Sequence, residues 1–235
     1  MSQTLISQIQ LLACNRATVG WEEPSGQTLP IASNELLFYT IGTEYGGNDT
    51  TTFNLPTLAP SNKVNYYCNI AIPGSNNEDF ASVIGEVILW PGTRMPEGWY
   101  ECNGQFLPQA NSSLYPVIGD VFGSKGSEFA VPTIPSPKSN PNLRYIICGF
   151  GYEAKDLAGY VSSIKWFAGD TDTLPTSWEK CKGQEVAIRS NTTLYSLLGT
   201  TYGGNEETFY YPTLPDLTPG VSSMLCLTGF YPPRI

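Results

Sequence analysis

The sequence contains no histidine, the residue that most often binds metals and moves protons in protein sites. A metal site built on imidazole and a catalytic triad that depends on histidine are therefore excluded. The six cysteines include no closely spaced CxxC pair, so a cysteine zinc site is not indicated either. We expect no cofactor.

Charge is also sparse, and most of it is negative. Only 14% of the residues are charged, and 12 lysines and arginines stand against 21 aspartates and glutamates. A protein that binds nucleic acid needs a basic surface, which this composition does not supply. We therefore expect no nucleic-acid partner.

Long apolar runs are absent as well. No stretch of about 18 apolar residues occurs, so insertion into a membrane is not expected. The first residues, MSQTLISQIQLLACN, lack the positive n-region and the long apolar stretch of a secretory signal. The sequence therefore does not predict export by the general secretory route.

The chain does contain one sequence pattern three times, in residues 20–56, 98–132 and 177–212. Alignment of the copies places their tryptophans in register, 78 and 79 residues apart. A long period that keeps the same residues in a fixed order indicates repeated structural units. An aromatic residue at one place in every unit more often anchors a core than stacks on a sugar. The repeated positions that we expect to form the core and turns of each unit are Trp21, Trp99, Trp178, Gly26, Gly104, Gly183, Leu37, Leu114, Leu194, Phe53, Phe129 and Phe209.

Each copy predicts several short strands and one short helix. It begins with a run that alternates apolar and polar residues, starting at Ile6, Ile84 or Val161, which is typical of a half-buried strand. In the third copy, SNTTLYSLLG predicts a helix of about two turns that ends at Gly199. The expected fold class is α+β, mostly β with one short helix per unit.

We place the three units at residues 1–72, 84–150 and 161–235, with linkers at 73–83 and 151–160. Units of this size are marginal alone, so they should pack on one another. A repeated head-to-tail contact either closes into a ring or continues as a fibre. We therefore expect a monomer whose three units pack about a pseudo-threefold axis, and a linear string of three units is the competing model.

The cysteines allow two interpretations, because each unit holds two of them. One hypothesis is a disulfide in every unit. The other is that the cysteines are small buried apolar residues. The disulfide hypothesis pairs Cys14 with Cys68, Cys102 with Cys148, and Cys181 with Cys226.

Two further groups of residues are candidates for binding. Asp49, Glu206 and Glu207 lie in glycine-rich turns where Ca²⁺ could bind, although solvated turn residues are the favoured interpretation. The aromatic residues that the repeat does not explain form a speculative ligand face. They are Tyr66, Tyr67, Tyr152, Tyr160, Tyr210 and Tyr211.

The middle copy, GEVILWPG…PEGWYECNGQFLP…NSSLYPVIGDVFG…EFAVPTIP, resembles the phage tail collar domain, which also occurs in bacterial proteins of the microcystin-dependent-protein type. The third copy resembles it through SLLGTTYGGNEETFYYPTLPDL, and the first through YTIGTEYGGNDTTTFNLPTL. This resemblance implies a small β-rich unit of tail fibres and injection machines. Family members of the fibre type act as trimers, so one chain with three units would imitate a trimer. The sequences that follow the copies, TLAPSN, TIPSPK and TLPDLTPG, depart from the Arg-Gly pattern of many members.

The leading functional hypothesis is a structural or adhesive protein without enzymatic activity. Its partner would be a cell-surface glycan, or a protein of a tail or injection system. One alternative is a glycan hydrolase driven by carboxylates, which requires two carboxyl groups about 5 to 10 Å apart in one cleft. Another is a scaffold that binds only neighbouring tail or injection-system proteins.

Overall fold

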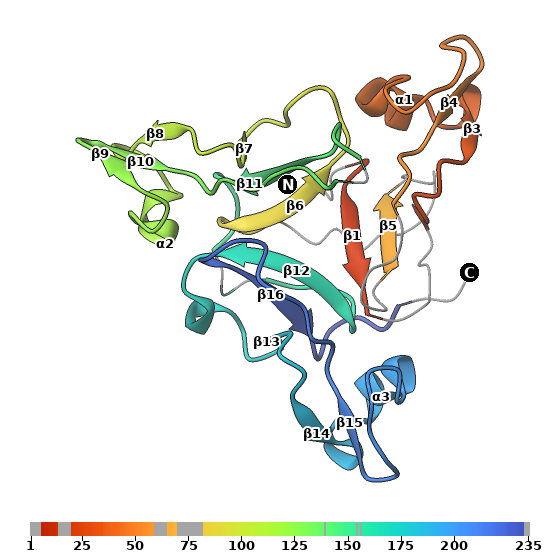
Figure 1. The fold of residues 1–235 in the computed structure, drawn as a ribbon, viewed down its shortest axis with the longest axis vertical. Coiled ribbons are helices and arrows are strands. Elements are labelled where there is room, and N and C mark those ends of the chain that lie inside the picture. The colour runs from red at the N-terminus through yellow and green to blue at the C-terminus, as the bar shows by residue number, and fades with distance from the viewer. Residues whose placement is uncertain are drawn as a thin grey trace.

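The computed structural model describes residues 6–13, 20–58, 65–69, 82–138, 140–153, 155 and 157–232. The protein is mostly β-structure with a few short helices, which confirms that part of the predicted fold class. Its largest sheet has nine strands and curls around the centre of the molecule. Three small lobes extend from this sheet in different directions (Figure 1).

Each unit contributes three strands to the large sheet, and all of their pairings are antiparallel. The first strand of the unit pairs with its last strand, which pairs in turn with the short strand that carries the repeated tryptophan. The strands are β1 (Ile9–Leu12), β5 (Asn65–Asn69) and β2 (Trp21–Glu22) in unit 1; β6 (Glu86–Trp90), β11 (Arg144–Cys148) and β7 (Trp99–Glu101) in unit 2; and β12 (Ser163–Ala168), β16 (Val221–Cys226) and β13 (Trp178–Lys180) in unit 3.

The three central strands β1, β6 and β12 also pair with one another. The three pairings are equivalent in the repeat. In each of them, a residue at the position of Ile9 lies opposite a residue of another unit at the position of Leu11. The pairs are Ile9 with Leu89, Leu11 with Ile164, and Val87 with Trp166. The three alternating runs of the sequence therefore meet at the centre of the sheet and link the units.

The lobes are formed by the segments between the second and last strand of each unit. Each contains a short helix and a small antiparallel ladder. Lobe 1 holds β3 (Thr28–Pro30), η1 (Ile31–Ser33), α1 (Glu35–Ile41) and β4 (Thr52–Asn54); lobe 2 holds β8 (Phe106–Pro108), α2 (Tyr115–Ile118), β9 (Ser124–Lys125) and β10 (Glu128–Ala130); lobe 3 holds β14 (Glu185–Ala187), η4 (Ile188–Ser190), α3 (Thr192–Leu198) and β15 (Thr208–Tyr210). A further single turn, η3 (Thr171–Thr173), follows β12.

Lobes 1 and 3 each contact another unit through a tyrosine. The Tyr45 hydroxyl of lobe 1 donates to the Pro91 carbonyl of unit 2 at 2.9 Å. The Tyr202 hydroxyl of lobe 3 donates to the Ala13 carbonyl of unit 1 at 2.7 Å. Lobe 2 has Phe122 at the equivalent position, and its ring lies against Gly220 of unit 3.

A single apolar core joins the units on one face of the central strands. It includes Ile9, Leu89 and Ile164 from these strands. It also takes in the repeated leucines and phenylalanines of the lobes, which are between 0% and 1% exposed: Leu37, Leu114, Leu194, Phe53, Phe129 and Phe209. Trp21 belongs to this core as well, whereas Trp99 and Trp178 are buried in two smaller clusters. The repeated leucines and phenylalanines of the sequence pattern therefore form the shared core.

The repeated glycines meet a backbone requirement. Gly26, Gly104 and Gly183 have φ of +78°, +78° and +71°, a region that residues with a Cβ rarely adopt. A Cβ at any of them would overlap the hydroxyl of a threonine, Thr57 for example. Glycine is needed here because the turn leaves no space for a side chain.

Candidate functional site

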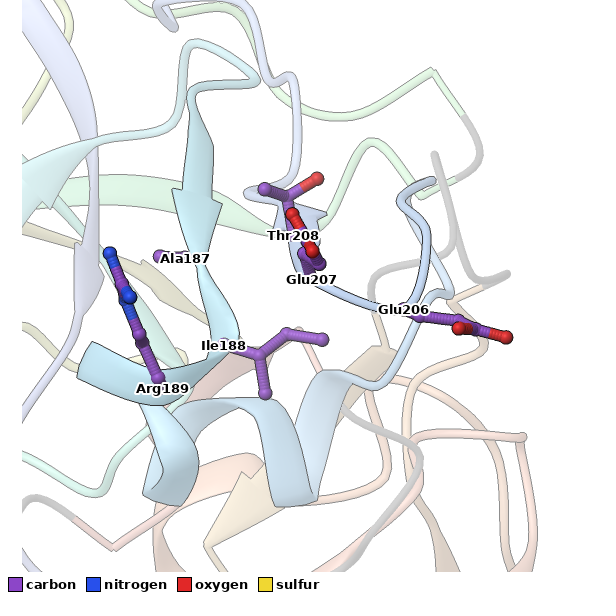
Figure 2. A pocket seen from close by; sticks show the side chains of 6 residues that line it. All are labelled: Ala187, Ile188, Arg189, Glu206, Glu207 and Thr208. Atoms are coloured by element: carbon purple, nitrogen blue, oxygen red, sulfur yellow. The ribbon is translucent and has the colours of Figure 1, made fainter.

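Lobe 3 contains a cleft of about 520 Å³ on its surface. The end of β14, the η4 turn and the glycine-rich loop before β15 surround it (Figure 2). Its lining residues are Ala187, Ile188, Arg189, Glu206, Glu207 and Thr208. A surface cleft that offers both charged and apolar side chains is a suitable place for a small polar ligand.

The walls of the cleft are held together by hydrogen bonds of the loop. The Ile188 amide donates to the Glu207 carbonyl at 2.9 Å and joins the two walls. The Asn205 side-chain oxygen accepts from the amides of Glu207 and Thr208 at 2.8 and 2.9 Å. The Thr208 hydroxyl donates to Glu185 of β14 at 2.7 Å. These hydrogen bonds tie the glycine-rich loop to β14 and to the η4 turn.

The charges of the cleft are separated. Figure 2 shows Arg189 on one side of Ile188, and Glu206 and Glu207 on the other side. Both glutamates are exposed, and Arg189 forms no ion pair with any residue that the structure describes. The residues that line the cleft thus include one guanidinium donor and two carboxylate acceptors, which lie on opposite sides of the backbone that carries Ile188.

This charged cleft distinguishes lobe 3 from the other two lobes. The position of Arg189 is held by Ala32 in lobe 1 and by Ala110 in lobe 2. In lobe 2 the positions of the two glutamates are held by Gly126 and Ser127. The framework is thus repeated, whereas the groups available for binding are not.

The candidate Ca²⁺ residues are not brought together. Asp49 belongs to lobe 1, while Glu206 and Glu207 belong to lobe 3. Among the residues that the structure describes, no group of three or more histidine, cysteine, aspartate or glutamate residues is arranged to hold a metal ion. The arrangement offers no joint site for these three carboxylates.

Two of the six tyrosines that were predicted to form a ligand face are buried, so the prediction was wrong for them. Tyr160 is 5% exposed and Tyr211 is 2% exposed, so neither presents its ring to a ligand. Tyr211 packs against Phe209 in the core, and burial, with a contribution from Glu179, raises the pKa of Tyr211 to about 12. Tyr152 is exposed and Tyr210 is half-buried, on different units. The side chains of Tyr66 and Tyr67 lie outside the described residues.

Sequence reasoning named Tyr152 but missed its exposed neighbour Phe150 at the end of unit 2. Phe150 is 78% exposed and is followed two residues later by Tyr152, which is 48% exposed. The ring of Tyr100 packs close to Gly149 beside them. Phe150 follows the last strand of unit 2, and Thr228 stands at its place in unit 3. That mismatch between copies was the available signal.

The disulfide hypothesis is corrected in units 2 and 3, where Cys102, Cys148, Cys181 and Cys226 are free, buried thiols. The Cys102 amide donates to the Tyr145 carbonyl, so Cys102 lies three residues along the strand from Cys148. Three residues span about 10 Å and an odd offset turns the side chains to opposite faces, whereas a disulfide needs Cα atoms within about 7 Å.

The same offset separates the two cysteines of unit 3, because the Cys181 amide donates to the Ser223 carbonyl. Burial raises the pKa of Cys148, Cys181 and Cys226 to about 12, and it raises the pKa of Cys102 as well. These thiols therefore behave as small apolar core residues. Cys14 and the side chain of Cys68 lie outside the described residues.

The described part of the chain contains no helix with the length and apolar character needed to cross a membrane.

Comparison with known proteins identifies the repeated unit. The family model of the phage tail collar domain matches residues 7–60, 85–135 and 162–220. Neither curated proteins nor solved structures gave a match. The three matched segments follow the three copies of the repeat and together cover more than half of the chain. The chain therefore belongs to the phage tail collar domain family, with three tandem copies of the domain.

Proposed function

We propose that the chain is a structural and adhesive component of a phage tail fibre or a related particle, and that it recognises an acidic cell-surface glycan. Membership of the collar family supports the structural role. The charged cleft of lobe 3 is the observation that carries the recognition.

The proposal includes the arrangement of the units. One chain would act as a monomer with three units, bounded as the sequence predicts, about a pseudo-threefold axis. The equivalent pairings among β1, β6 and β12 support this arrangement, because every central strand meets both of the others in the same register. The matching contacts of Tyr45 and Tyr202 with the following unit support it as well.

The chemistry of the cleft indicates the kind of glycan. A guanidinium binds a carboxylate or phosphate group with two parallel hydrogen bonds, which makes Arg189 the anchor for an acidic sugar. Glu206 and Glu207 would accept hydrogen bonds from sugar hydroxyls at the other end. Ile188 lies between them and would contact the apolar face of a sugar ring.

Binding of acidic oligosaccharides by calorimetry tests this proposal. Hydrogen bonds to charged groups contribute about 1.5–3 kcal/mol, so Arg189→Ala should weaken binding roughly 10- to 150-fold. Lys125→Ala is the control, because it removes one positive charge from the glycine-rich loop of lobe 2, outside the cleft, and should leave the affinity unchanged.

Two results would contradict the proposal. One is equal loss of affinity in both variants, or no binding of any acidic oligosaccharide. The other is turnover of the oligosaccharide by the wild type that disappears in Glu207→Gln, since this would show a hydrolase in place of an adhesive protein.

A further inference from the structure

A buried ion pair joins units 2 and 3 at the centre of the sheet. Lys165 Nζ of β12 lies 2.8 Å from Glu86 Oε1 of β6, and the two side chains are 7% and 1% exposed. The other carboxylate oxygen of Glu86 accepts from the Val83 amide at 3.2 Å. Both charges are therefore removed from water and face each other across two units.

The pair lies where the three central strands converge. One residue beyond each of the pairs between these strands, the strand registers bring Gln10, Ile88 and Lys165 opposite one another. These are equivalent positions of the repeat, and one of the three carries a charge. The position of Glu86 is held by Gln8 in unit 1 and Ser163 in unit 3. The face of these strands that carries Ile9, Val87 and Ile164 is apolar in all three copies, whereas the opposite face carries different residues in each unit.

The placement of the two charges distinguishes the two ways in which three units can follow one another around a ring. In the observed order the beginning of β6 meets the end of β12, and Glu86 lies beside Lys165. In the reversed order the beginning of β6 would meet the end of β1, and Glu86 would face Gln10. Lys165 would then face Gln8. Both charges would be buried against neutral amides.

A buried ion pair contributes little more than apolar residues of the same size, whereas a buried charge without its partner is strongly destabilising. The best-attested role of such groups is to select one register or assembly over others. We propose that the Glu86–Lys165 pair selects the cyclic order of the three units and rejects the reversed ring. This inference rests on the closed arrangement proposed above.

The test compares the wild type with the full-length apolar variant Glu86→Leu/Lys165→Met, by backbone NOEs between strands and by light scattering. The observed order gives NOEs from residue 9 to 89 and from 11 to 164. The reversed order gives NOEs from 9 to 166 and from 11 to 87. The apolar variant should lose its single set of NOEs and show both sets, or form oligomers, without a fall in its melting temperature.

The matched control is Glu153→Leu/Lys155→Met, which replaces an exposed pair of the same residue types at 2.7 Å and should keep the wild-type NOEs. An apolar variant that is a monomer with only the wild-type NOEs would overturn the inference. Absence of the 9–89 and 11–164 NOEs from the wild type would instead contradict the closed arrangement itself, and the inference with it.

A charge exchange decides the matter if the apolar variant does not fold. Glu86→Lys and Lys165→Glu should each lose the soluble monomer, because two like charges would then be buried together. The double variant Glu86→Lys/Lys165→Glu should recover the monomer and the wild-type NOEs. Failure to recover them would overturn the inference.

Discussion

The junction between units 2 and 3 differs from the other two junctions of the molecule. The contacts of lobe 1 with unit 2 and of lobe 3 with unit 1 each use a tyrosine hydroxyl on a backbone carbonyl. The contact of lobe 2 with unit 3 has Phe122 instead, and that junction holds the buried pair of Glu86 and Lys165. Equivalent backbones thus associate through different chemistry, and each kind of contact should respond differently to substitution.

The largest effect that we expect comes from high pH, through the thiols of the two units at this junction. Charge on Glu86 contributes to the raised pKa of Cys148, while Lys165 lowers the pKa of Cys226, although burial dominates both. An unfolded thiol has a pKa near 8.5, against about 12 for these two. Stability should therefore be full below about pH 8.5 and fall as the pH rises toward 12, by about 1.4 kcal/mol per pH unit for each thiol.

Urea unfolding at pH 7.5, 9 and 10 measures this dependence. In Cys181→Ala the free energy of unfolding should fall less steeply with pH, by about 1.4 kcal/mol per pH unit, since Cys181 is buried in the same way. Equal free energies of unfolding at pH 7.5 and pH 10 would contradict the protonated, buried state of the thiols.

The next effect is the loss of one partner of the buried pair. Lys165→Met leaves Glu86 buried without its counter-charge, and such changes cost about 3–5 kcal/mol. Urea unfolding at pH 7 gives the free energy directly. Lys155→Met removes the same charge from an exposed pair and should leave the free energy of unfolding unchanged. Equal effects of the two substitutions would remove the distinction between this junction and the surface.

The tyrosine junctions should show a smaller effect. Tyr45→Phe and Tyr202→Phe each remove one hydrogen bond between units and should lower the free energy of unfolding by about 0.5–1.5 kcal/mol. Tyr39→Phe is the control, because its exposed hydroxyl accepts from Arg94 of the same unit 2 and should contribute less. A loss at Tyr39 as large as at Tyr45 would show that the part-buried position of the Tyr45 bond gives it no extra weight.

The smallest effect tests whether the third junction can be made like the others. Ala168 occupies the position of Pro91 and Ala13, so the hydroxyl of a Phe122→Tyr variant would be directed toward the Ala168 carbonyl. We expect a gain of about 0.5 kcal/mol, at the low end for one hydrogen bond. Thermal unfolding should show a small rise in the midpoint, and a fall would mean that the lobe 2 contact differs in geometry as well as in chemistry.

The repeat made much of the core predictable from the sequence. Leu114 and Phe129 have a counterpart in every copy because the same backbone, repeated three times, directs these side chains into one shared core. Local patterns also predicted the helix that ends at Gly199, since α3 covers Thr192–Leu198 and Gly199 has a positive φ. Features that depend on contacts within one copy were therefore accessible.

Features that depend on strand register were not accessible. The predicted disulfide between Cys102 and Cys148 was wrong. It rested on the presence of two cysteines in each unit, and that number does not reveal the offset between neighbouring strands. The prediction that Tyr211 is exposed was wrong because its side chain packs in the core just after β15. The charged cleft around Arg189 joins two loops that are separate in the sequence, so no local pattern indicated it.

The mass of the protein in solution tests the central claim, that three units close on one another within one chain. Light scattering at low and high protein concentration should give a mass near 25.7 kDa at both. A stable trimer or a larger assembly at both concentrations would contradict the claim, because the central strands would then find their partners in other chains.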